Sequence, residues 1–326
     1  MLARKILRLT FLCIAFTSLV IGCSSDDEDD IDLRNSADFA VLTANTVDAD
    51  IAALGKKLYE DKQLSGDGTV SCMSCHDVAK GGDDGRPTSL GINDQEGPIN
   101  APTVLNASYN VLQFWDGRAA TLEDQAGGPI ENPKEMGGNI ADVIVYLKGD
   151  TEYSNAFAAA FSDGVTEANI RFSIAEYERT LVTLNSPFDQ YLSGDDDAMS
   201  EAALRGAQLF AKIGCSDCHN GPALGGSSFE KLGVAKDYFK DRGNVTEADY
   251  GRYNVTANEA HRHQFKVPTL RNIELTDPYL HDGTVTTLDE AIRKMATYQL
   301  DMTLEDDEVS DLTAFLKALT GEIPGA

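Results

Sequence analysis

The pentapeptides Cys72-Met73-Ser74-Cys75-His76 and Cys215-Ser216-Asp217-Cys218-His219 decide the fold of this chain. Both read Cys-x-x-Cys-His, the attachment signature of a c-type haem. Two thiols three positions apart can bond the two vinyl groups along one porphyrin edge, and the next histidine then lies under the iron as proximal ligand. We therefore expect two covalently bound haem c groups, one at Cys72, Cys75 and His76, the other at Cys215, Cys218 and His219.

Two other kinds of site also use paired cysteines. A zinc site built from both pairs would not need a histidine directly after each of them. A thioredoxin-like site would follow a strand, whereas Gly66-Asp67-Gly68 precedes the first pair and a predicted helix precedes the second. Neither alternative accounts for two copies of the same pentapeptide, so the pattern favours haem.

The N-terminus reads as an export signal. Arg4, Lys5 and Arg8 precede a short apolar stretch, which is typical of a signal peptide over residues 1–22. The stretch ends in Leu19-Val20-Ile21-Gly22-Cys23, which resembles a bacterial lipobox, so we expect cleavage before Cys23 and a lipid on its thiol. An ordinary signal peptide with a chance cysteine is the alternative. The expected location is the bacterial cell envelope, lipid-anchored and facing either the periplasm or the cell exterior.

Composition excludes several classes of protein. The chain has 326 residues, enough for two domains. Its net charge of −26 argues against nucleic acid as a partner and favours a basic protein. No apolar run reaches the ~18–20 residues of a membrane span. The acidic run that begins at Asp26 predicts a solvated tether, which we extend from the lipid at residue 23 to residue 45.

Hydrophobic spacing predicts a mostly helical protein with few or short strands. Helices are expected at 48–60, from Ile170 to a stop at Pro187, after a Ser200 cap, after a Thr287 capping box, and from Val309 to Leu319. Residues 80–97 read as a long loop. Each half runs helix, Cys-x-x-Cys-His, loops, helices. We therefore expect two packed cytochrome c-like haem domains, an N-terminal one at 46–190 and a C-terminal one at 191–326.

Further segments carry a family resemblance. In order, they are Gly97-Pro98-Ile99-Asn100-Ala101-Pro102-Thr103, Gln113-Phe114-Trp115-Asp116-Gly117-Arg118, Asn132-Pro133-Lys134-Glu135-Met136, Pro268-Thr269-Leu270-Arg271-Asn272, Pro278-Tyr279-Leu280-His281-Asp282-Gly283 and Met295-Ala296-Thr297-Tyr298-Gln299-Leu300. With the two haem motifs they resemble the bacterial di-haem cytochrome c peroxidases, a group that includes MauG-like enzymes. The resemblance implies reduction of hydrogen peroxide to water. Electrons from a small donor, cytochrome c or a cupredoxin, would enter at the C-terminal haem and pass to an N-terminal, peroxidatic haem.

The resemblance also implies roles for single residues. Met295 would be the sixth ligand of the electron-transfer haem, where MauG-like enzymes have a tyrosine; a core methionine is the alternative. Glu135 would move the proton during peroxide cleavage, with Gln125 as hydrogen-bonding partner. From its residue type alone, Glu135 would be a surface acid. Phe114 would wall the distal pocket, and Trp115 would lie between the haems, unless it is a core aromatic.

One position departs from the family pattern. Many members carry a histidine in a Ser-x-Gly-His loop, and it ligates the peroxidatic haem in the oxidised state. Here the loop reads Ser89-Leu90-Gly91-Ile92, and isoleucine cannot ligate iron. We therefore expect that haem to be five-coordinate or water-bound when oxidised. His261 or His263 could supply a substitute ligand, but we expect both in a solvated segment.

Calcium and self-association are also implied by the resemblance alone. The matching calcium ligands are Asn100 by its side chain, with Thr276 and Pro278 by their carbonyls, and oxygen ligands suit this ion. Family members are often homodimers. The role of His281 stays open. Two other functions compete with the peroxidase: a non-enzymatic di-haem electron carrier, and a MauG-like oxidase of a protein or organic substrate. Glu135 and Gln125 argue against the carrier, and Met295 argues against the oxidase.

Overall fold

Two pairs of crossing helices organise the chain, and each pair includes the helix that leads into one Cys-x-x-Cys-His motif. A computed structural model describes residues 30–325, and the chain from Ile31 onward forms one compact unit. The predicted signal peptide, Cys23 and the start of the tether lie outside the described residues. Within the described part, no helix is long and apolar enough to cross a membrane.

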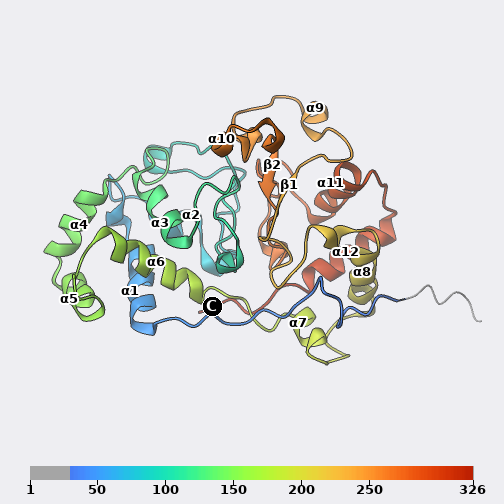
Figure 1. Ribbon diagram of the computed structural model, residues 1–326, viewed down its shortest axis with the longest axis horizontal. Helices are drawn as coiled ribbons and strands as arrows, with labels where there is room; N and C mark the ends of the chain where they lie inside the picture. Colours follow the sequence, from blue (N-terminus) through green and yellow to red (C-terminus); the bar gives the residue numbers. More distant parts are fainter. Residues whose placement is uncertain (1–29, 326) are drawn as a thin grey trace, which may run out of the picture. The chain divides into compact units, whose positions relative to one another are not determined.

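The architecture is mostly helical, as expected, with a single two-stranded sheet among the described residues (Figure 1). The α-helices are α1 (Ala49–Glu60), α2 (Cys72–Cys75), α3 (Leu122–Glu131), α4 (Ile140–Gly149), α5 (Thr151–Ala160), α6 (Glu167–Thr180), α7 (Pro187–Leu192), α8 (Glu201–Lys212), α9 (Tyr238–Arg242), α10 (Tyr253–Thr256), α11 (Leu288–Leu300) and α12 (Asp306–Lys317). The strands are β1 (Phe229–Lys231) and β2 (Gln264–Lys266), paired antiparallel with Phe229 opposite Lys266.

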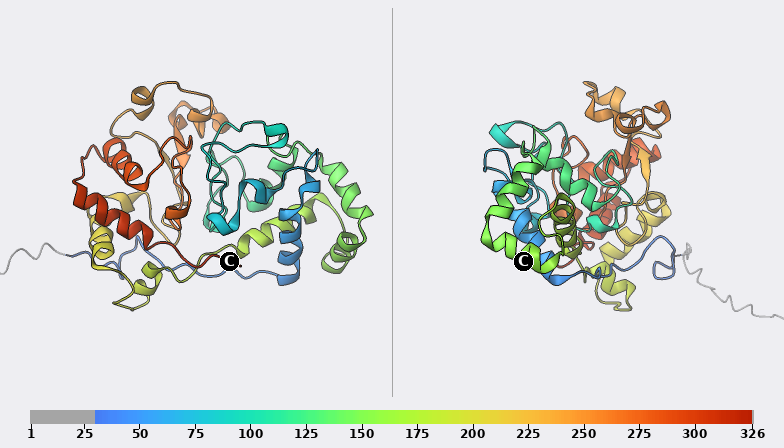
Figure 2. Two further views of the ribbon diagram at one scale, coloured as in Figure 1. Left: turned by 180° about the vertical axis from the view of Figure 1, so that it is seen from behind. Right: turned by 60° about the vertical axis from the view of Figure 1, so that its left-hand side comes forward.

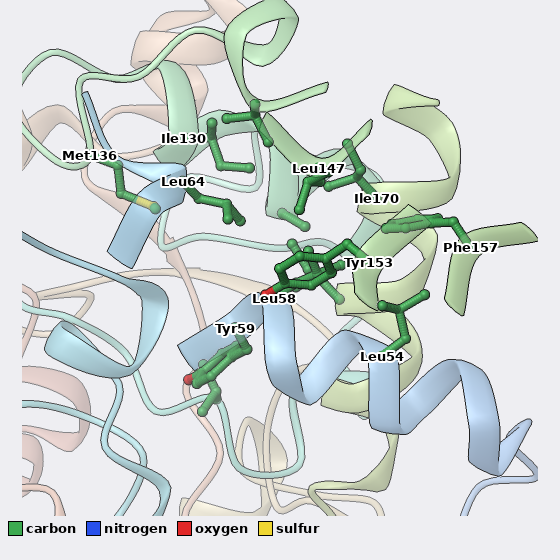
Figure 3. Packing of buried hydrophobic residues seen from close by; sticks show 14 of the residues in the cluster. Leu54, Leu58, Tyr59, Leu64, Ile130, Met136, Leu147, Tyr153, Phe157 and Ile170 are labelled. Carbon is green, nitrogen blue, oxygen red and sulfur yellow. The ribbon is translucent and has the colours of Figure 1, made fainter. Parts of the chain in front are cut away.

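The first hydrophobic cluster forms where α1 crosses α6. Leu54 and Leu58 of α1 pack with Phe157 of α5 and Ile170 of α6 (Figure 3). A Cβ atom on Gly55 would lie 1.8 Å from the Ser173 carbonyl oxygen, so only glycine lets the two helices approach this closely. Helix α1 begins at an Asp48 cap, which agrees with the predicted 48–60 helix.

The second cluster repeats this arrangement with α8 and α12. Ser200 caps α8 by accepting a hydrogen bond from the Ala203 amide, as predicted. Phe210 of α8 and Phe315 of α12 lie edge to face with ring centroids 5.2 Å apart. A Cβ atom on Gly206 would lie 1.9 Å from the Asp311 carbonyl oxygen. In both halves, a glycine at the helix crossing therefore allows close packing of the helix that precedes the haem motif.

Two expectations about element boundaries need correction. Residues 31–45 are not part of a solvated tether, because Leu33, Phe39 and Leu42 are buried and the first two belong to the second cluster. Pro187 does not stop the long helix: α6 already ends at Thr180, and Pro187 instead occupies the first turn of α7. Helices α4 and α5 were not predicted at all.

The strand pair links the two groups of helices. In Figures 1 and 2, β1 and β2 lie between the group that contains α1 and α6 and the group that contains α8 and α12. The Lys266 amide of β2 donates to the Trp115 carbonyl at 2.8 Å, which ties the strand to a loop of the first half. Leu181 still belongs to the first hydrophobic cluster, whereas Phe188 of α7 belongs to the second. The boundary between the two cores therefore lies between these residues.

Candidate active site

Each Cys-x-x-Cys-His motif folds into a short helical turn. The His76 amide donates to the Cys72 carbonyl, and the His219 amide donates to the Cys215 carbonyl, both at 3.0 Å. The four cysteines of these motifs form no disulfide, and burial raises the pKa of Cys72 and of Cys215 to about 12. Neither pair is therefore a disulfide or an activated thiolate of the kind that redox enzymes use.

The two histidines are oriented alike. Nδ1 of His76 lies 3.2 Å from the Gly82 carbonyl, and Nδ1 of His219 lies 3.3 Å from the Leu224 carbonyl. A carbonyl can only accept, so Nδ1 carries the proton in each ring and Nε2 keeps its lone pair. Burial lowers the pKa of both histidines, that of His219 to about 4, which keeps the rings neutral. A neutral imidazole fixed through Nδ1 is suited to bind a metal through Nε2, so these residues fit haem.

A polar cluster gathers around α3 in the first half. Gln125 and Asn132 are seven residues apart and so lie on one face of the helix. Asn132 Nδ2 donates to Glu135 Oε1 at 2.7 Å. A Cβ atom on Gly128, which lies between them on the helix, would be 3.7 Å from the Phe114 ring. Phe114 thus lies beside Gly128 and Glu135 beside Asn132, and both of these positions follow Gln125 along the same side of the helix.

Two groups in this cluster are chemically unusual. Burial raises the pKa of Glu135, although the Arg118 charge and the Asn132 hydrogen bond oppose the shift. Arg118 itself lies over the Phe114 ring, 3.4 Å from its centroid. Gln125 Oε1 is buried and has no hydrogen-bond partner in the described part of the chain. A buried acceptor without a partner is free to bind a small hydrogen-bonding ligand.

Ile92 lies against the same segment. Its amide donates to the Glu135 carbonyl at 2.7 Å, and its side chain is buried beside Gly137. Gly91 allows this approach, because a Cβ atom there would lie 2.1 Å from the Lys134 carbonyl. The loop that lacks the histidine is therefore packed onto the backbone that carries Glu135.

The other histidines do not approach either motif through the contacts they make. His263 is not solvated as expected, since it stacks on Phe239 at 4.0 Å and its Nδ1 donates to the Asp249 carbonyl. His261 Nδ1 pairs with the Thr256 hydroxyl at 2.9 Å. Both rings are held by residues of their own surroundings, which argues against a role as substitute haem ligands.

Trp115 lies where loops of both halves meet. Its Nε1 donates to the Asn100 carbonyl at 2.9 Å, and its ring meets Phe265 of β2 edge to face, with centroids 6.3 Å apart. Phe265 in turn stacks on His281 at 4.2 Å. Trp115 is thus the tryptophan that joins the two halves through packed aromatic rings.

His281 belongs to a buried charged network. Its Nε2 donates to Asp249 Oδ1 at 2.7 Å. Arg242 pairs with both Asp249 and Asp282. Burial tends to raise the pKa of Asp249, but hydrogen bonds from His281 and Arg242 outweigh it and hold that pKa below its usual range. Asp249, His281 and Asp282 could hold a metal by their spacing, but Arg242 already pairs with both carboxylates.

Sequence reasoning missed a detailed internal repeat. Pro102-Thr103-Val104-Leu105-Asn106 matches Pro268-Thr269-Leu270-Arg271-Asn272, and Trp115-Asp116-Gly117 matches His281-Asp282-Gly283 at the same offset. The backbone repeats too: Asn106 and Asn272 have φ values of 60° and 59°, and Phe114 and Leu280 have values of 68° and 69°. Thr121 and Thr287 cap α3 and α11 in the same way. The recurring Pro-Thr and Asp-Gly pairs were a signal that could have revealed this repeat.

Met295 lies on α11, which begins at the predicted Thr287 cap. The second hydrophobic cluster includes Ile292 and Ala296 of the same helix but not Met295, which is half-buried. A methionine that fills a core gap would belong to that cluster. Its position therefore leaves the thioether available to a ligand in this half.

The three predicted calcium ligands offer oxygen atoms that accept no hydrogen bond from the described residues. Asn100 is buried and uses its Nδ2 to donate to the Arg86 carbonyl, while its Oδ1 accepts no hydrogen bond from the described residues. Among the described residues, nothing donates to the carbonyls of Thr276 and Pro278. Burial raises the pKa of the nearby Asp83 to about 7, and the charges of Asp84 and Asp277 add to the shift. This acidic, oxygen-rich region fits a hard cation.

Comparisons with known proteins agree with this geometry. The sequence model of the family described as di-haem cytochrome c peroxidase matches residues 49–197. A cytochrome c551 peroxidase of Nitrosomonas europaea is 51% identical over 85% of this chain and 81% of the relative. The cytochrome c peroxidase Ccp of Escherichia coli is 49% identical over 84% of this chain, which spans 59% of that longer relative. The solved structure of a MauG-like protein associated with microbial copper homeostasis is similar with a TM-score of 0.76 and 30% identity, covering 85% of this chain and 91% of that one.

Proposed function

Because this chain belongs to the di-haem cytochrome c peroxidase family, we propose that it reduces hydrogen peroxide to water with electrons from a small redox protein. The N-terminal motif would hold the peroxidatic haem and the C-terminal motif the electron-transfer haem. The observation that carries the proposal is the cluster around α3: Gln125 has a buried, unsatisfied acceptor, and Asn132 at the end of the helix holds the half-buried Glu135.

The residues of this cluster would direct the proton. Bound haem iron would supply the site for the peroxide oxygen and the electrons that cleave the O–O bond. The Glu135 carboxylate would accept the proton of the near oxygen and return it to the far oxygen, which leaves as water. Gln125 Oε1 would accept the remaining peroxide O–H. Overall, one peroxide, two electrons and two protons give two waters.

Electron delivery would depend on the second half. Met295 and His219 would hold the electron-transfer haem, and a thioether ligand would close that site to peroxide. Trp115 and its contact with Phe265 support electron passage between the halves. The net charge of −26 favours a basic donor, such as a small cytochrome c or a cupredoxin.

We infer that the oxidised peroxidatic site is open. Ile92 is held by the Glu135 carbonyl and by packing beside Gly137, so its loop has neither a ligating side chain nor a free path to the site. We further propose a calcium ion at Asn100, Thr276 and Pro278, domains divided near residue 190, and a lipid anchor at Cys23. A homodimer is proposed from the resemblance alone.

Peroxide turnover by fully oxidised, haem-loaded protein tests the function. Reduced cytochrome c is supplied only as donor, and we expect turnover without a lag because no ligand must leave first. A lag that pre-reduction removes would keep the peroxidase but contradict the open site. No turnover in either state would contradict the peroxidase and favour an electron carrier or a MauG-like oxidase.

A further inference from the structure

Lys266 is a buried lysine that has no carboxylate partner in the described part of the chain. Its side chain lies on β2 and the residue is only 6% exposed. It forms no ion pair with any described carboxylate, in a chain with 53 acidic and 27 basic residues. Burial alone lowers the pKa of Lys266 to about 7, and no acidic group opposes the shift. A lysine in such a setting is charged only if an anion pairs with it, and the described residues supply none.

The strand directs Lys266 away from the aromatic cluster. Alternation along β2 puts Phe265 on the face with Trp115 and His281, and Lys266 on the opposite face beside its cross-strand partner Phe229. The Arg252 guanidinium lies over the Phe229 ring at 4.2 Å and pairs with no described carboxylate either. This face of the sheet is therefore positive.

The same strand continues to the second haem motif. The Val267 amide donates to the Ser228 carbonyl, and the Gly226 amide donates to the Val267 carbonyl at 2.7 Å. One residue further, hydrogen bonding to the Pro268 carbonyl opposes the fall in the pKa of His219. The Nδ1 atom of that ring donates to the Leu224 carbonyl. Lys266 thus begins the segment that lines the proximal side of His219.

The internal repeat gives an independent argument. At the offset that relates Pro102 to Pro268, Lys266 matches Asn100. The Asn100 amide donates to the His281 carbonyl and the Lys266 amide donates to the Trp115 carbonyl, both at 2.8 Å, and His281 matches Trp115 in the same repeat. The first half has oxygen ligands suited to a cation at this position. The second half has an ammonium group of its own there.

We propose that the Lys266 ammonium binds a propionate carboxylate of the haem attached at Cys215 and Cys218. Lys266 would be a positioning residue that also raises the reduction potential of this haem, because a nearby positive charge disfavours the ferric iron. The inference rests on haem attachment in the proposed function and is independent of peroxide turnover.

The test compares haem-loaded Lys266→Met with Lys231→Met. Lys231 is an exposed residue at the end of the same sheet, so both variants lose one positive charge. The readouts are the midpoint potential of each haem by spectroelectrochemical titration and the propionate bending bands by resonance Raman spectroscopy. We expect Lys266→Met to shift the potential of the C-terminal haem to more negative values and to change a propionate band. Lys231→Met should change neither, and Lys266→Arg should restore the potential.

Unchanged potentials and bands in Lys266→Met with normal haem content would overturn the proposal, as would an equal shift in Lys231→Met or a shift confined to the N-terminal haem. If Lys266→Met does not accumulate as holoprotein, Lys266→Gln takes its place with the same readouts. If both neutral variants fail to load haem, loading of Lys266→Arg at the wild-type potential supports the proposal, and failure of Lys266→Arg contradicts it. Peroxide turnover is assayed separately. An inactive wild-type protein with normal haem potentials would contradict the proposed peroxidase activity but not the proposed role of Lys266.

Discussion

Glu135 is the residue on which the proposed chemistry depends most directly. Replacing it with glutamine keeps its size but removes the proton acceptor, so we expect peroxide turnover to fall by about 10²–10⁴-fold. Haem content and the visible spectrum of the oxidised protein should not change. The matched control is Glu131→Gln, an exposed glutamate at the end of α3, which should retain activity. Equal turnover by wild type and Glu135→Gln would exclude Glu135 as the proton-transfer group.

Asn132 helps to keep Glu135 charged. Burial raises the pKa of Glu135, and the Arg118 charge and the hydrogen bond from Asn132 both stabilise the carboxylate and limit that rise. Only the carboxylate can take the peroxide proton, so activity is lost as the pH falls through this pKa. Asn132→Ala removes a hydrogen bond to a charged group, worth about 1.5–3 kcal/mol, and should move the acidic limb of the kcat/KM profile to higher pH by about one unit or more. A Lys134→Ala control should leave the limb in place; an unshifted limb in Asn132→Ala would show that another group controls it.

At the scale of elements, the crossing of α8 and α12 depends on one missing side chain. Gly206→Ala would place a Cβ atom 1.9 Å from the Asp311 carbonyl, so the helices must separate. We expect the free energy of unfolding to fall by about 1–3 kcal/mol despite the better helix propensity of alanine. Urea denaturation followed by circular dichroism measures the change.

Gly149→Ala provides the comparison for that experiment. Gly149 ends α4, and a Cβ atom there would meet nothing within 4 Å. This variant should be neutral or slightly more stable, since alanine is favoured in helices by up to about 1 kcal/mol. If both alanine variants had the same stability, close helix approach would not be the reason for Gly206.

At the scale of the whole molecule, one buried ion pair fastens distant segments together. Arg271 is 0% exposed and pairs with Asp189 of α7 at 2.9 Å. It also donates to the carbonyls of Ala40 and Pro222. Arg271→Met leaves a buried carboxylate without its partner, so we expect a loss of about 3–5 kcal/mol in the free energy of unfolding.

The control for this prediction is Arg205→Met. Arg205 pairs with Asp311 through two 2.8 Å hydrogen bonds, but its side chain is largely exposed, so little change in stability is expected. Urea unfolding of both haem-loaded variants would decide between them. A similar urea midpoint for Arg271→Met and Arg205→Met would contradict the prediction, because breaking the buried ion pair would then cost no more stability than breaking the exposed one.

Some of this organisation was readable from local patterns. The caps at Ser200 and Thr287 and the helices that follow them are confirmed, because a cap and an amphipathic repeat act within a few residues. Helices α4 and α5 were missed, since Asn139 and Asp150 give caps without a long periodic stripe after them. Pro187 was misread as a stop because proline fits the first turn of a helix as well as it ends one.

By itself, the sequence determined the haem attachment points, the family and the mostly helical class, because these follow from residue types at fixed short spacings. Only the tertiary structure decided that the Gln125 acceptor is buried without a partner and that Ile92 donates to the Glu135 carbonyl. It also decided that Lys266 is buried with no acid beside it in the described part of the chain. Burial and partnership depend on segments far apart in the chain, and no local pattern reports which distant carbonyl or charge a side chain will meet.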